Sequence, residues 1–87
     1  MKPLKYWKKA SEEIILEFEQ DGDKILDAWD NNGDILFITR PQPPSQEEYF
    51  IGKKGLSQMS EPELLGKAKD EKQALEFAEG FMEENDE

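Results

Sequence analysis

The chain has 87 residues, of which 36% are hydrophobic and 37% are charged, and its formal net charge is −10 at pH 7. It contains no cysteine and no histidine, which excludes disulfides, thiolate metal sites and the usual general base near neutral pH. The length fits one small domain, and two tryptophans, two tyrosines and five phenylalanines set the chain apart from a disordered acidic one.

The first ten residues form a basic and aromatic segment. Four lysines surround Tyr6 and Trp7, and residues 1–10 contain no acidic side chain. Lysines interleaved with aromatic rings can contact phosphates and stack on bases, but the acidic remainder of the chain offers the same segment counter-charges. We expect residues 1–10 to be an arm or an edge strand that docks on the protein itself. No long apolar run follows the lysines, so we expect no signal peptide.

A period-two pattern marks the next segment. Residues 13–19, EIILEFE, predict a strand with Ile14, Leu16 and Phe18 on its dry face. Residues 20–23, QDGD, are then expected to form a turn.

The following segment predicts a hairpin. Residues 24–30, KILDAWD, form its first strand, although their imperfect alternation leaves open which face is buried. Asn32-Gly33 is typical of a type I′ turn, because both residues tolerate positive φ. Residues 34–39, DILFIT, are apolar on both faces, which indicates a central strand covered above and below.

Proline then interrupts the sheet. Residues 41–46, PQPPSQ, predict a stiff extended loop, because proline supplies no donor to a strand ladder. The PxxP match in this loop is also the form of a docking segment for proline-recognising domains. Residues 47–54, EEYFIGKK, predict a fourth strand.

We expect the rest of the chain to be helical. Ser60-Glu61-Pro62-Glu63 has the capping-box pattern and predicts a short helix, which Gly66 weakens. Asp70 predicts the start of a longer amphipathic helix, whose apolar stripe consists of Ala74, Leu75, Phe77, Ala78, Phe81 and Met82. Residues 83–87, EENDE, are expected to be a disordered acidic tail.

The predicted fold is α+β: an antiparallel meander of three to four strands with a C-terminal amphipathic helix packed on one face. We expect one domain over residues 11–82, preceded by the basic segment and followed by the tail. The longest apolar run has four residues, so no membrane segment is expected, and we assign the protein to the cytoplasm.

The sequence does not support a calcium-binding loop, a phosphate-binding loop or a deep catalytic cleft. A calcium loop that starts at Asp30 would put Ile35 where glycine is needed and Pro41 where glutamate is needed. No glycine-rich phosphate loop is present, and a small sheet with one helix offers little room for a deep cleft. We therefore expect no catalytic activity and no cofactor.

The acidic side chains support a function in protein interaction. We expect a non-enzymatic module that binds a partner protein with a basic surface, and in a sharper version a nucleic-acid mimic whose carboxylates replace phosphates in a basic cleft. The candidate partner-binding residues are Asp21, Asp23, Asp30, Asp34, Glu71, Glu76, Glu79, Glu83 and Glu84.

Three alternatives stay open. A nucleic-acid-binding module would use the lysine segment and one sheet face with Arg40, Lys53 and Lys54, although the net charge makes nucleic acid an unfavourable partner. A weak divalent-cation site would use Asp27, Asp30 and Asp34. An exposed strand edge would allow a homodimer instead of a monomer.

The sheet followed by "KDEKQALEFAEGFM", residues 69–82, resembles the arm-binding domains of tyrosine integrases. That resemblance implies DNA contact through a basic sheet. The sheet of this chain is acidic, so we assign no family.

Overall fold

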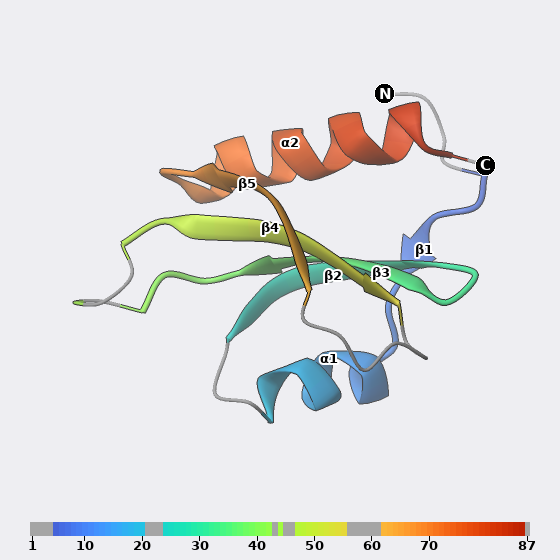
Figure 1. The fold of residues 1–87 in the computed structure, drawn as a ribbon, viewed down its shortest axis with the longest axis horizontal. Helices are drawn as coiled ribbons and strands as arrows, with labels where there is room; N and C mark the ends of the chain where they lie inside the picture. Colours follow the sequence, from blue (N-terminus) through green and yellow to red (C-terminus); the bar gives the residue numbers. More distant parts are fainter. Residues whose placement is uncertain (1–4, 21–23, 43, 45–46, 56–61, 87) are drawn as a thin grey trace.

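The computed structural model describes residues 5–20, 24–42, 44, 47–55 and 62–86. Over these residues the chain forms a five-stranded antiparallel meander in the order β1-β2-β3-β4-β5, with two helices (Figure 1). The elements are β1 Lys8–Lys9, α1 Glu12–Glu19, β2 Ile25–Asn31, β3 Asp34–Thr39, β4 Tyr49–Gly55, β5 Glu63–Ala68 and α2 Glu71–Glu84. The mixed α+β class and the antiparallel meander were predicted, but the sheet has five strands instead of three to four, and helix α1 was not predicted.

The β2–β3 hairpin agrees with the sequence. Asn32 and Gly33 have φ angles of 55° and 97°, as a type I′ turn requires, and β3 is buried from Ile35 to Thr39. A bulge at Leu26 explains the imperfect alternation of β2, because one extra residue shifts the side chains beyond it to the other face.

The prediction of a strand at residues 13–19 was wrong, because this segment is helix α1. Ser11 is the N-cap, and its side chain accepts a hydrogen bond from the Ile14 N–H. The spacing of Ile14, Ile15 and Phe18 puts these side chains on one side of the helix, against the sheet. Leu16, which the strand prediction buried with Ile14 and Phe18, is 58% exposed. The predicted turn that follows lies largely outside the described residues.

The prediction of a short helix after Ser60 was also wrong. Ser60 lies outside the described residues, and the segment beyond Pro62 is strand β5, paired antiparallel with β4. Gly66, which weakens a helix, has a different use in the strand: a Cβ atom there would lie 2.8 Å from the ring of Phe77. The proline-rich loop falls partly outside the described residues, and its predicted conformation stays untested.

Helix α2 begins where the sequence predicts. The side chain of Asp70 accepts a hydrogen bond from the Gln73 N–H at 2.8 Å, and Ala74, Ala78 and Met82 are buried. The end of the helix differs from the prediction. It continues through Glu84, so the first two residues of the expected disordered tail are helical.

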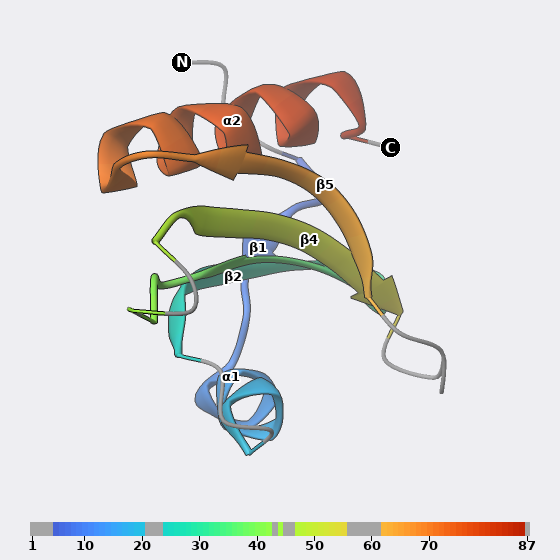
Figure 2. The ribbon, with the colours of Figure 1, turned by 60° about the vertical axis from the view of Figure 1, so that its left-hand side comes forward.

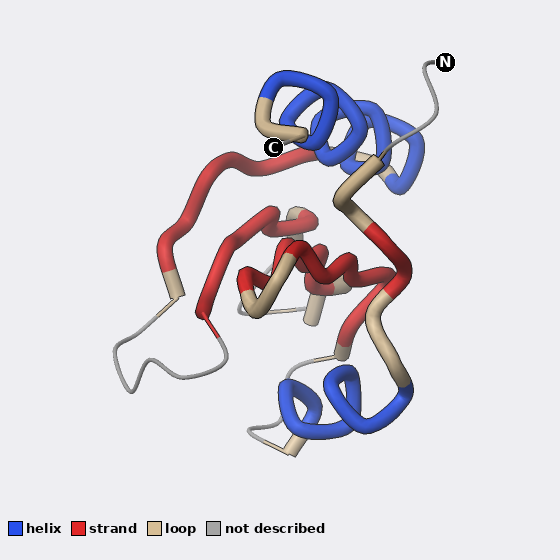
Figure 3. Tube along the Cα trace, turned by 90° about the vertical axis from the view of Figure 1, so that its right-hand side faces the viewer, coloured by secondary structure: helices blue, strands red, loops and turns tan. Residues whose placement is uncertain are grey.

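The two helices lie on opposite sides of the sheet (Figures 2 and 3), so the sheet has a core on each face. On the α2 side, Leu36 and Ile38 of β3 pack with side chains of α2 and with both tryptophans. On the α1 side, Ile35 and Phe37 of β3 pack against α1. The alternation within β3 therefore supplies both cores, as a central strand covered on both sides requires.

Thr39, at the end of β3, provides a test of packing on the sheet. Its Oγ1 is buried and has no hydrogen-bond partner among the described residues. A buried hydroxyl without a partner costs about 1–3 kcal/mol. We expect Thr39→Val to raise the free energy of unfolding by about 1 kcal/mol in urea denaturation. Thr39→Ser, which keeps the hydroxyl and removes the methyl group, should lower it, and equal effects of the two substitutions would contradict this explanation.

Neither α1 nor α2, the helices of the described chain, has the length and apolar character needed to cross a membrane.

Candidate functional site

Helix α2 carries a row of carboxylates along one side. Glu76, Glu79 and Glu83 are spaced by three and four residues, which makes them neighbours on the helix surface. Glu76 and Glu83 are exposed and Glu79 is half-buried. Within the described residues none of the three forms a salt bridge. We call these three residues the α2 acidic row.

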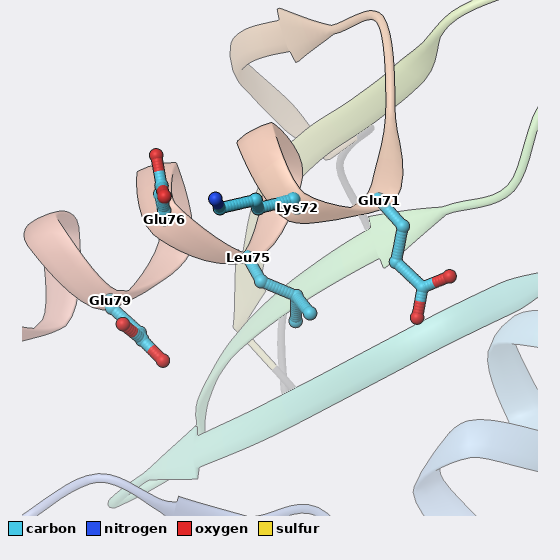
Figure 4. A pocket seen from close by; sticks show the side chains of 5 residues that line it. All are labelled: Glu71, Lys72, Leu75, Glu76 and Glu79. Carbon is cyan, nitrogen blue, oxygen red and sulfur yellow. The ribbon is translucent and has the colours of Figure 1, made fainter.

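A shallow hollow of about 440 Å³ lies beside this row and is lined by Glu71, Lys72, Leu75, Glu76 and Glu79. Figure 4 shows Leu75 extending from α2 toward the strands, with Glu71 and Glu79 on either side, whereas Glu76 points away from the strands. Leu75 packs on the core of the α2 side. The hollow thus combines a partly buried apolar floor with a carboxylate rim that contains one lysine.

The other predicted site residues do not join this row. Glu84 follows Glu83 directly, so it lies about 100° further round the helix axis. Asp34 is exposed at the start of β3, and Asp30 uses its Oδ1 to accept the Gly33 N–H at 3.0 Å. Asp21 and Asp23 lie outside the described residues. The structure therefore brings together three of the predicted carboxylates, with Glu71 at the end of the adjoining hollow.

The described part of the lysine segment, residues 5–9, connects the hairpin to the end of α2. Lys8 pairs with Asp30 in the sheet, and the backbone N–H groups of Lys5 and Tyr6 donate to the carboxylate of Asp86 at 2.8 and 2.7 Å. A hollow of about 630 Å³ is lined by Lys5, Tyr6, Lys8, Asp30, Asn31 and Asn32. The carboxylates of the hairpin and of α2 therefore do not merge into one acidic surface, because basic residues separate them.

The two backbone hydrogen bonds from Lys5 and Tyr6 lower the pKa of the Asp86 carboxyl, because they stabilise its charged form. A folded-state pKa below the unfolded value gives stability that is present above the unfolded pKa and lost as the pH falls through the folded pKa. We expect an NMR titration to show the carboxyl of Asp86 titrating below the ordinary aspartate range. The amide signals of Lys5 and Tyr6 should shift in the same transition. Asp86→Asn should remove this transition from both amides, and amides that titrate unchanged in the variant would contradict the assignment.

The structure makes the alternative function, a nucleic-acid-binding module, less favourable. Trp7 is only 5% exposed, so its ring is not free to stack on a base. Lys53 and Lys54 are neighbours in β4, so their side chains point to opposite faces of the sheet. Of the aromatic side chains in the lysine segment, Tyr6 alone is exposed, at 45%.

The three aspartates of the cation alternative do not come together. Asp27 forms a salt bridge with Lys9, and Asp30 holds the hairpin turn. Asp27 of β2 lies opposite Ile38, near the end of β3, whereas Asp34 is the first residue of β3. The two aspartates are therefore at different ends of that strand. In the described parts of the chain, no three acidic, histidine or cysteine side chains are grouped to hold a metal ion.

Sequence reasoning missed a second acidic helix face. Glu12, Glu13 and Glu17 of α1 are exposed around Leu16, and a further hollow of about 430 Å³ is lined by Glu12, Ile15, Leu16 and Glu19. The signal that could have revealed this face is Ser11 followed by two glutamates, because an N-cap residue before acidic side chains favours a helix start.

No protein-family model, no curated protein and no solved structure matches the chain. The functional argument therefore depends on the geometry of these surfaces.

Proposed function

We propose that this chain is a non-enzymatic protein-interaction module that binds a basic surface of a partner protein through the α2 acidic row. The observation that supports the proposal is the row itself: three carboxylates on one side of a helix, without salt bridges among the described residues, beside a hollow in which Leu75 is the apolar residue. Unpaired charges of one sign on a rigid helix attract a partner of opposite sign over about a Debye length.

The spacing of the row also supports the sharper version of the proposal, nucleic-acid mimicry. At 1.5 Å rise per residue, the three carboxylates follow one another at about 4.5 and 6 Å along the helix axis. One strand of duplex DNA carries a charge about every 3.4 Å along its axis. The row therefore carries one charge over an axial length that holds one to two phosphates of a strand, so a cleft lined with lysine and arginine for a phosphate backbone offers partners to the row.

The test compares two variants with the same loss of charge. In one, Glu76, Glu79 and Glu83 are replaced by glutamine; in the other, Glu12, Glu13 and Glu17 of α1 are replaced by glutamine. Basic proteins captured from a cell lysate at low salt by the immobilised wild type are identified by mass spectrometry, and their affinity for each variant is then measured. We expect roughly tenfold weaker binding to the α2 variant, because three ion pairs at the surface contribute about 0.5 kcal/mol each.

The α1 variant serves as the control for net charge. It should bind the captured proteins as the wild type does, because its substitutions leave the α2 acidic row intact. Equal weakening by both variants would mean that only net charge matters, and it would contradict the proposal. Release of the captured protein by an excess of duplex DNA would support mimicry, whereas retention would restrict the proposal to an ordinary basic partner.

A further inference from the structure

One half of the sheet face on the α1 side lacks a helix in the described part of the chain. Helix α1 packs on β2 and β3 through the cluster of Ala28, Ile35 and Phe37. In the register, Phe50 of β4 lies between Thr39 and Lys67, and Leu64 of β5 lies opposite Gly52. Cross-strand partners share a face, so Phe50 and Leu64 lie on the α1 side.

This surface combines apolar and basic side chains. Leu64 is 55% exposed and Phe50 is half-buried, with the Lys67 ammonium 5.4 Å from the centre of the Phe50 ring. Lys54 lies on the same face, 6.0 Å from the ring of Phe18 in α1. We call Phe50, Leu64, Lys54 and Lys67 the open β4–β5 face. Its two lysines make it a basic patch in a chain of net charge −10.

The outward side of α1 has the complementary chemistry. Leu16 is the most exposed large apolar side chain of the described residues, at 58%, and exposed Glu12, Glu13 and Glu17 surround it. Ile14, Ile15 and Phe18 occupy the sheet-facing side of the same helix, so Leu16 and the glutamates point away from the protein's own sheet. The apolar centre and acidic rim match the apolar centre and basic rim of the open β4–β5 face.

We propose that two copies of this chain form a two-fold dimer in which α1 of each copy packs on the open β4–β5 face of the other. Both surfaces lie on the same side of the sheet, so one two-fold axis joins both pairs at once, as an isologous interface requires. Each α1 then packs between its own sheet and the partner's sheet. Leu16 is buried against Phe50 and Leu64, and the glutamates of α1 face Lys54 and Lys67.

Dimerisation through a strand edge, the alternative expected from the sequence, is less favourable. The edge strand β1 has two residues, and both are lysines. The other edge strand, β5, contains a bulge between its pairs with Ile51 and Gly52 and also carries Lys67. Short length, lysines and bulges are the features by which natural sheets prevent edge pairing.

The first measurement is the mass in solution at physiological ionic strength, where repulsion between two acidic proteins is screened beyond about 8 Å. We expect a mass of about 20 kDa in sedimentation equilibrium, twice the 10.1 kDa of one chain. A single-chain mass up to about 1 mM protein, where even a contact of about 4 kcal/mol is half populated, would overturn the proposal.

A charge exchange then tests the interface itself. One variant carries Lys54→Glu and Lys67→Glu, and the other carries Glu13→Lys and Glu17→Lys. Each variant alone brings like charges together at both contacts, so its dimer should dissociate at least about tenfold more readily than the wild type. Mixed in equal amounts, the two variants restore opposite charges at both contacts, and we expect a heterodimer.

Further variants separate the interface from folding and from other surfaces. Leu64→Asp should give a folded monomer by circular dichroism, whereas Tyr6→Asp, at an exposed side chain outside the interface, should stay dimeric. Two charge-exchange variants that stay monomeric when mixed would overturn the proposal, and so would a dimer that tolerates Leu64→Asp. The α2 acidic row lies on the other side of the sheet. When affinities for a basic partner are compared at protein concentrations at which the wild type and its variants are monomers, these outcomes are independent of the proposed partner binding.

Discussion

Replacing Trp7 by alanine is expected to lower the free energy of unfolding by about 3–5 kcal/mol, the usual cost of truncating a buried tryptophan. The indole is 5% exposed and belongs to the core on the α2 side. Its Nε1–H donates to the Asn85 carbonyl at 3.1 Å, and its ring meets Phe81 edge to face, with centroids 6.1 Å apart. The loss is large beside the total stability of about 5–15 kcal/mol that is typical of native proteins.

Tyr6→Ala is the matched control, because it truncates the neighbouring aromatic side chain, which is 45% exposed. Its expected cost in urea denaturation is within about 0.5 kcal/mol, as for most surface substitutions. Similar losses for the two variants would contradict the role of Trp7 as the core residue of this segment. A large difference would show that the contacts of the Trp7 ring with the end of α2 stabilise the fold.

The elements that could be predicted from the sequence have local signals that agree with their tertiary surroundings. Asn32 and Gly33 adopt the positive φ angles of a type I′ turn, and β3 is apolar on both faces, as its cover by a helix on each face requires. Asp70 begins α2 for the same reason: its carboxylate satisfies a backbone N–H of the first turn. In these places local and long-range requirements lead to the same structure.

The segment of α1 fits two periodicities, and the predicted strand follows the one that the structure does not adopt. Ile14, Leu16 and Phe18 fit a strand, whereas Ile14, Ile15 and Phe18 fit one side of a helix. The β-branched isoleucines favoured the strand, but a sheet on one side and the Ser11 cap at the start decide for the helix. A pattern of eight residues cannot separate these cases without the cap.

The error at β5 has a different cause. The capping-box pattern at residues 60–63 is a local signal, but the residues after it pair with β4 over five register positions. Strand pairing depends on residues distant in sequence, so short-range patterns do not report it. In the predicted helix Gly66 was a destabilising residue, whereas in strand β5 the absence of a side chain leaves room for the Phe77 ring.

The candidate site could be predicted in part. Helix α2 was predicted together with its five glutamates, and the spacing of Glu76, Glu79 and Glu83 within that helix puts these three on one side; their part in binding stays a prediction. Their separation from Asp30 by the lysine segment could not be predicted, because it depends on the hydrogen bonds of Asp86 and on the β1–β2 pairing. Because the segment of α1 was predicted as a strand, its acidic helix face was not predicted.

Gly52→Ala is expected to destabilise the protein by about 1–3 kcal/mol, because the added methyl group has no space in the core of the α1 side. A Cβ atom at this position would lie 2.7 Å from Phe37 Cζ and 3.2 Å from the backbone oxygen of Glu63. The Phe37 ring is buried and stacks on Phe18 with centroids 4.9 Å apart, so it cannot move aside freely. The loss of glycine's flexibility in the unfolded chain offsets only a part of this cost.

Gly80→Ala makes the same chemical change where the structure leaves space, and it should have the opposite sign. Gly80 is exposed within α2, and a Cβ atom there would have no neighbour within 4 Å, so helix propensity should raise the stability by about 1 kcal/mol.

A double-mutant cycle of Gly52→Ala with Phe37→Leu identifies the cause of the destabilisation by Gly52→Ala. If the clash with the Phe37 ring is responsible, Gly52→Ala costs less in the Phe37→Leu background. An undiminished cost there would place the strain at the Glu63 backbone oxygen, on strand β5, instead of in the aromatic stack.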